Sequence, residues 1–160
     1  MTVLVIGVGH ADRGDDAAGL VVADRVRATA PRGVEVIEHS GDLISLMDAW
    51  AGRERVYLID AVVAGGGPGT VLRFDARADP PPARFGRQGT HGAGVAEAIE
   101  LARVLGLLPS RLTIYGITGS SFTLGAGLSP AVLRAVSAVC AQVRDELTQG
   151  TNVHGPTAGG

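Results

Sequence analysis

Cysteine and clustered basic residues are nearly absent from the sequence. A single cysteine, Cys140, excludes an internal disulfide and a cysteine-rich zinc module, and it fits a reducing compartment. The 14 basic residues are all arginines scattered along the chain, and no basic stripe interleaved with aromatic residues can be found. We therefore expect no nucleic-acid partner.

Long apolar runs are also missing. No uninterrupted run approaches the roughly 18–20 apolar residues that a membrane-spanning helix needs. The opening MTVLVIGVG has no basic segment ahead of its apolar residues, as a signal peptide would have, and it is typical of a first strand. We expect a cytoplasmic protein that has no membrane partner.

Aromatic residues are scarce, so the core must be built from aliphatic side chains. Of the 160 residues, 46% are hydrophobic but only 4% are aromatic, and the net charge is -2. This length and composition are typical of one folded domain whose core consists of Val, Leu, Ile and Ala. The apolar spacing around Cys140 places that residue in the buried stripe of the last helix, which predicts a packing role for it.

Strand and helix patterns alternate along the chain. Apolar β-branched runs predict strands at 3–8, 34–38, 56–61, 70–74 and 112–117. Helical spacing predicts helices at 18–30, 43–50, 95–105 and 130–149. We expect one three-layer α/β domain over residues 1–149, with a twisted, mostly parallel sheet flanked by helices on both faces.

Three segments depart from the alternation. The strand at 70–74 follows the third strand too closely for a helical crossover, which predicts an antiparallel edge strand and a mixed sheet. Residues 75–90 include three successive prolines and are expected to form one long loop. Residues 150–160 are polar and rich in glycine, and we expect a disordered tail there.

An acidic, glycine-punctuated turn, GHADRGDDAAG, follows the first strand. Its aspartates, Asp12, Asp15 and Asp16, lie where a dinucleotide-binding protein would hold a pyrophosphate, and like charges repel. A nucleotide site is therefore disfavoured, although Glu38 is placed as a ribose-binding acid would be. The turn could instead hold a helix-capping aspartate or a cation.

Cation ligands could converge on this turn from elsewhere in the fold. Asp60 ends the third strand and His91 precedes a later helix, so both could meet Asp16 at the carboxyl edge of the sheet. Two carboxylates and one imidazole suit nickel, zinc or iron. From the residues alone, Asp60 could equally bind backbone amides, and His91 could simply begin its helix. We regard the remaining histidines, His10, His39 and His154, as weaker ligand candidates.

The order of five motifs resembles one known family. VLVIGVGHADRGDDAAG, HSGDLISLMDAW, VYLIDAVVAGGGPGT, THGAGVAEAIELARVLG and YGITGSSFTLGAGLSPAV occur in this order and span nearly the whole chain, from Val3 to about Leu147. Each motif is short, but together they are similar to the maturation endopeptidases of NiFe hydrogenases. This resemblance implies the α/β domain already predicted for residues 1–149.

The resemblance also implies an activity and a site. Members of this family remove a short C-terminal extension from the precursor of the hydrogenase large subunit after nickel has been inserted. Asp16, Asp60 and His91 match the metal-binding positions, and either Asp16 or Asp60 would activate water. The nickel belongs to the substrate, although other divalent metals can occupy such a site. We expect a monomer, with Asp15 left to cap the helix.

Several positions depart from the pattern of the family. His10 stands where an asparagine is usual, Thr118 replaces a glutamate or glutamine, and Ala93 lies where a bulky residue is often found. The three expected ligands are intact, so we expect activity. One alternative is an inactive relative that binds the precursor without cutting it, and another is a nucleotide-binding α/β protein.

Overall fold

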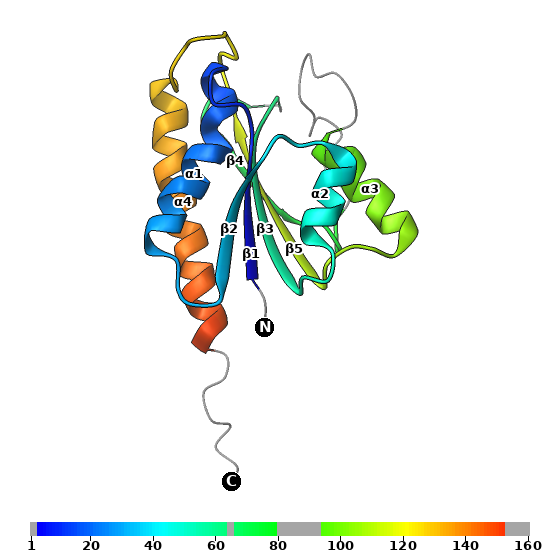
Figure 1. Ribbon diagram of the computed structural model, residues 1–160. Helices are drawn as coiled ribbons and strands as arrows, with labels where there is room; N and C mark the ends of the chain where they lie inside the picture. Colours follow the sequence, from blue (N-terminus) through cyan, green and yellow to red (C-terminus); the bar gives the residue numbers. More distant parts are fainter. Residues whose placement is uncertain (1–2, 64–65, 80–93, 153–160) are drawn as a thin grey trace.

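The computed structural model describes residues 3–63, 66–79 and 94–152 (Figure 1). Within them, five strands form one sheet in the order β2-β1-β3-β5-β4. The strands are β1 (Val3–Val8), β2 (Val34–His39), β3 (Arg55–Val62), β4 (Val71–Asp75) and β5 (Arg111–Thr118). All neighbouring pairs are parallel except β4, which runs antiparallel to β5 at one edge. This confirms the predicted mixed sheet and its antiparallel edge strand.

Helices cover both faces of the sheet, as predicted. A short 3₁₀ helix, η1 (Gly14–Ala17), leads into α1 (Ala18–Thr29), and α2 (Leu43–Trp50), α3 (Val95–Leu105) and α4 (Pro130–Asn152) follow. Figure 1 shows α1 and α4 on one face of the sheet and α2 and α3 on the other. Each pair encloses its own apolar cluster against the sheet. The three-layer α/β architecture is therefore confirmed.

Two helix ends differ from the sequence-based expectation. α4 continues through residue 150, where we expected a tail to begin, and ends at Asn152. Each added residue of a formed helix gains a hydrogen bond, so polar residues can extend it. Leu105 falls at the helical spacing of the apolar residues of α3, which predicts a buried side chain, but it is 55% exposed at the end of the helix, where Gly106 is the C-cap. Residues 80–93 and 153–160 lie outside the described residues, and with them most of the predicted loop and the tail.

The core is aliphatic, with a few large aromatic side chains inserted. Trp50, Tyr57 and Tyr115 are among the largest fully buried residues. Cys140 is 2% exposed between α4 and α1, so the predicted packing role is confirmed. None of the helices in the described part of the chain combines the length and the apolar character that a membrane span requires.

Glycine allows α1 to lie unusually close to the sheet. A Cβ added to Gly19 would be 2.3 Å from the carbonyl oxygen of Ile59 and 2.4 Å from that of Val8. A Cβ added to Gly7 would likewise be 2.3 Å from the carbonyl oxygen of Gly19. This close approach fixes the start of α1, and with it η1, against the ends of β1 and β3.

Candidate active site

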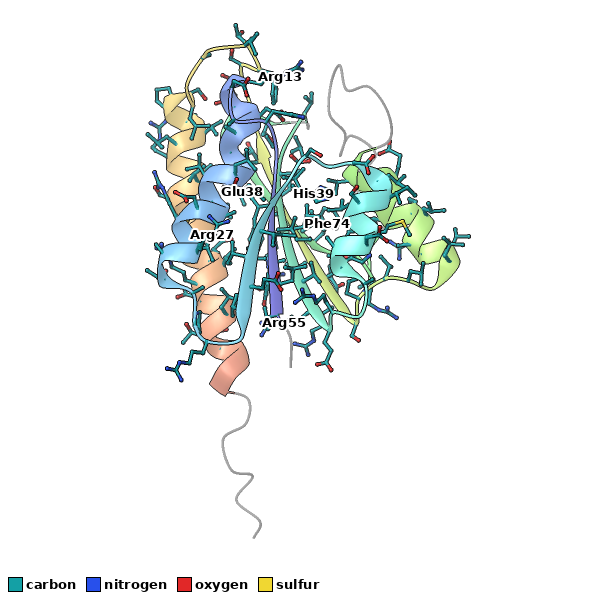
Figure 2. The ribbon with its side chains drawn as sticks, in the orientation of Figure 1. Arg13, Arg27, Glu38, His39, Arg55 and Phe74 are labelled. Atoms are coloured by element: carbon teal, nitrogen blue, oxygen red, sulfur yellow. The ribbon has the colours of Figure 1, made fainter. Side chains whose placement is uncertain are left out.

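Three buried aspartates lie at the carboxyl ends of β1 and β3. Asp15 and Asp16 belong to η1, which follows β1 and packs against β3, and Asp60 is near the end of β3. Their exposed fractions are 0%, 4% and 1%. Figure 2 shows Arg13, from the same turn as η1, at this end of the molecule, while Arg55 at the start of β3 lies at the opposite end. Buried carboxylates are rare without a partner or a function, so this edge is the candidate active site.

Asp16 forms a close contact within its own turn. The Nδ1 atom of His10 lies 2.7 Å from Oδ2 of Asp16. The side chain of His10 is 43% exposed, whereas that of Asp16 is only 5% exposed. The turn is closed by backbone hydrogen bonds as well, because the His10 amide donates to the Asp16 carbonyl (3.3 Å) and the Asp16 amide donates to the Arg13 carbonyl (3.0 Å). These contacts within the turn therefore help to orient Asp16.

The same closed turn leaves no cradle for a pyrophosphate. A Cβ added to Gly9 would lie 2.0 Å from the backbone oxygen of Asp16, so the chain itself fills the space beside the second glycine of the motif. Glu38, considered as a ribose-binding acid, lies 3.9 Å from Arg27 in an exposed ion pair. Neither of the two features considered for the alternative of a nucleotide site is formed by the described residues.

Asp15 does not cap a helix, and that prediction is wrong. Neither η1 nor α1 has a side-chain cap. Instead, the Asp15 carboxylate accepts hydrogen bonds from the amides of Ser120 (2.8 Å), Ser121 (3.0 Å) and Ser129 (2.7 Å), and from the Ser129 hydroxyl (3.0 Å). Burial alone would raise the pKa of Asp15, but these donors outweigh it and hold the pKa below its usual value.

These hydrogen bonds attach the loop at 119–129 to the acidic turn. The Asp15 amide donates to the Ser121 carbonyl (2.8 Å), and the Gly125 amide donates to the Asp12 carbonyl (2.7 Å). The loop also leads directly into α4. Asp15 therefore joins two segments that are remote in sequence into one wall of the candidate site, a role that sequence reasoning missed.

Thr118 lies at the same edge, at the end of β5. It pairs with Val62 in the sheet, two positions from the pair formed by Asp60 and Gly116. Thr118 is 4% exposed, and its hydroxyl has no hydrogen-bond partner among the described residues. Thr118, which replaces the glutamate or glutamine usual in the family, is thus buried beside the acidic edge.

The other histidines contribute little to the described site. His39 ends β2, and its Nδ1 accepts a hydrogen bond from the Gly41 amide (2.8 Å), so this nitrogen is used in a local turn. His91 and His154 lie outside the described residues. Within the described ranges, no three His, Cys, Asp or Glu side chains are grouped closely enough to hold a metal ion. The ligand set of Asp16, Asp60 and His91 therefore stays a prediction.

Comparison with known proteins decides the family. A family model described as hydrogenase maturation protease matches residues 21–146. The chain belongs to the hydrogenase maturation protease family. The resemblance inferred from the order of the motifs is thereby confirmed.

Relatives of this maturation protease agree with the match over nearly the whole chain. The hydrogenase 2 maturation protease of Escherichia coli K12 is 29% identical over 147 residues, which are 89% of this chain and 88% of the relative. The hydrogenase expression/formation protein HupD of Rhodobacter capsulatus is 29% identical over 150 residues, 91% of this chain and 70% of the relative. The solved structure of the hydrogenase maturating endopeptidase HybD from E. coli has a TM-score of 0.78 at 27% identity, with 94% of each chain covered.

Membership in the maturation protease family makes the chain a peptidase. Its acidic edge lies where the parallel strands end, which is where open α/β sheets commonly bind their ligands. Asp16 and Asp60 reach that edge from β1 and β3, two adjacent strands of the sheet. Sequence reasoning identified these two aspartates but neither the contact between His10 and Asp16 nor the role of Asp15.

Proposed function

We propose that this chain is an endopeptidase that removes the C-terminal extension of a NiFe hydrogenase large-subunit precursor once nickel has been inserted. Family membership supports both the peptidase activity and the hydrogenase substrate. The observation that carries the proposal is the pair of buried carboxylates, Asp16 and Asp60, on neighbouring elements at one edge of the sheet.

Nickel enters the proposed site as part of the substrate. Asp16, Asp60 and His91 would supply two carboxylates and one imidazole, a donor set that suits nickel and other divalent transition metals. Burial of Asp16 and Asp60 fits such a role, because a buried carboxylate is stabilised by a cation. A precursor that carries nickel would therefore be held in register, whereas an unloaded precursor would lack this contact.

Cleavage requires a group that takes a proton from the attacking water. Asp16 and Asp60 are the candidates, since a carboxylate beside the scissile bond can act as a general base. The bound metal would supply polarisation of the scissile carbonyl. We therefore propose a peptidase that depends on both the carboxylates and the metal of its substrate, acting as a monomer in the cytoplasm.

The test is processing of a nickel-loaded precursor by the purified protein, followed by mass spectrometry. We expect release of a C-terminal peptide from the loaded precursor and none from the unloaded one. Asp16→Asn and Asp60→Asn should each lower kcat/KM by more than about 100-fold, because each removes a charge that contacts the metal or the water. Asp48→Asn, an exposed change on α2, serves as the control and should leave processing unchanged.

Two outcomes would redirect the proposal. Tight association with the precursor without any loss of mass would support the alternative of a binding module that does not cut. Full activity of the Asp16→Asn and Asp60→Asn variants would show that these carboxylates are not the site.

A further inference from the structure

The contact between His10 and Asp16 has a geometry suited to holding a carboxylate in one orientation. The separation of Nδ1 and Oδ2 is 2.7 Å, within the range of hydrogen bonds strengthened by charge. The backbone on both sides of His10 is fixed, because the Gly9 amide donates to the His39 carbonyl (3.0 Å) and the Arg13 amide donates to the His10 carbonyl (3.4 Å). The imidazole is thus presented to Asp16 by an anchored turn.

We propose that His10 is a positioning residue for Asp16. Its Nδ1–H donates to Oδ2, and this fixes the side-chain rotamer in which Asp16 would contact the nickel of the substrate. The inference rests on the proposed role of Asp16 as a ligand. It assigns a function to a residue that departs from the pattern of the family, and it requires no additional ligand.

Burial of Asp16 increases the weight of this hydrogen bond. The Asp16 side chain is only 5% exposed, so water has little access to replace a lost hydrogen bond. Its neighbour Asp15 is held by donors from a remote loop, whereas His10 reaches Asp16 from within the same turn. Hydrogen-bond partners behind a metal ligand typically change metal affinity or activity by 10-fold to 100-fold when they are removed.

Nitrogen geometry distinguishes positioning from direct ligation. Nδ1 is already within hydrogen-bond distance of Asp16, so a direct role in metal binding would have to use Nε2 on the far side of the ring. The amide of an asparagine reaches the place of Nδ1, whereas the amide of a glutamine reaches that of Nε2. The variants His10→Asn and His10→Gln therefore separate the two roles.

The experiment measures processing of the nickel-loaded precursor and calorimetric binding of Ni²⁺ to the protein alone. We expect His10→Ala and His10→Gln to lower kcat/KM by about 10-fold to 100-fold and to weaken Ni²⁺ binding. His10→Asn should stay within about threefold of the unmodified protein, because it restores the donor at the position of Nδ1. Arg13→Ala, an exposed change in the same turn, is the control for Ni²⁺ binding and for the unfolding temperature.

Each outcome decides the role of His10. Unchanged processing by His10→Ala would overturn the proposal, as would activity retained by His10→Gln but lost in His10→Asn, which indicates a direct role of Nε2. If the protein alone does not bind Ni²⁺ measurably, the cleavage rates of the three His10 variants still distinguish positioning of Asp16 from direct metal binding. Asp16→Asn is the reference: if that variant also cleaves normally, the proposed function fails rather than the role of His10.

Discussion

Charged side chains in two regions of the molecule have different kinds of partner. Toward the end where β3 begins, the carboxylate of Glu146 in α4 pairs with Arg73 of β4 and accepts a hydrogen bond from the Tyr115 hydroxyl of β5. Arg55 donates to the backbone oxygen of Glu146 (2.9 Å) and lies over the ring of Tyr57. We call these residues the ion-paired cluster. Both members of its ion pair, Arg73 and Glu146, belong to the cluster itself.

At the carboxyl edge of the sheet, the described hydrogen-bond partners of Asp15 and Asp16 are neutral groups and one histidine. Asp15 is held by three amides and a hydroxyl, and Asp16 is held by His10. Consecutive buried carboxylates concentrate negative charge there. A cluster that pairs its own charges stabilises the fold and needs no ligand, whereas an edge rich in carboxylates suits a cation brought by a substrate. Charged side chains of this small domain thus stabilise the fold in one region and, as we propose, bind the substrate in the other.

The largest expected effect is that of Asp15→Ala on stability. The change removes the buried carboxylate that accepts hydrogen bonds from three backbone amides, those of Ser120, Ser121 and Ser129. We expect the free energy of unfolding to fall by about 3 kcal/mol, because three amides and one hydroxyl lose a charged acceptor together. Urea denaturation followed by circular dichroism measures this change.

A matched control lies three residues earlier in the same turn. Asp12 is exposed, so Asp12→Ala should change the free energy of unfolding by less than about 0.5 kcal/mol. Asp15→Ala should also slow processing, because the loop at 119–129 loses its attachment to the acidic turn. Equal stability of the two variants would mean that Asp15 does not hold that loop.

Local sequence patterns were sufficient to predict most of the fold. The bounds of α2 were predicted from its apolar spacing, and Asp42, just before the helix, accepts a hydrogen bond from the Ser45 amide (3.0 Å). The antiparallel β4 followed from a connection too short for a crossover. These features depend on residues close together in the chain, and periodicity and spacing describe such residues well.

The candidate site was predictable only in part, because its contacts join remote or irregular segments. Asp15 was expected to cap its own helix, but its partners are more than 100 positions away in the sequence. No pattern in the turn indicates that loop. Asp16 and Asp60 were identified because strand ends meet at one edge, whereas the contact between His10 and Asp16 depends on the path of the closed turn. Contacts of this kind between side chains leave no periodic pattern in the sequence from which they could be predicted.

A smaller effect is expected from the ion-paired cluster. Glu146→Ala removes the acceptor of the buried Tyr115 hydroxyl, but Arg73 is half-exposed and can turn to water. We expect the free energy of unfolding to fall by about 1–2 kcal/mol, with kcat/KM for the precursor unchanged. Denaturation and the processing assay on one preparation test both statements. A loss of cleavage at full stability would contradict the assignment of this cluster to structure alone.

The smallest effect should appear only in alkali. Burial, and next the hydrogen bond to Glu146, raises the pKa of Tyr115, and burial also raises the pKa of Tyr57. The unfolded chain therefore releases these protons first, from about pH 10, so stability is complete below that pH and falls as the pH rises further. Tyr115→Phe removes one of the two tyrosines in the chain. It should lessen the slope of unfolding free energy against pH by up to about 1.4 kcal/mol per unit. Denaturation at pH 9 and pH 11 measures that slope, and an equal slope in both proteins would show that Tyr115 ionises as readily folded as unfolded.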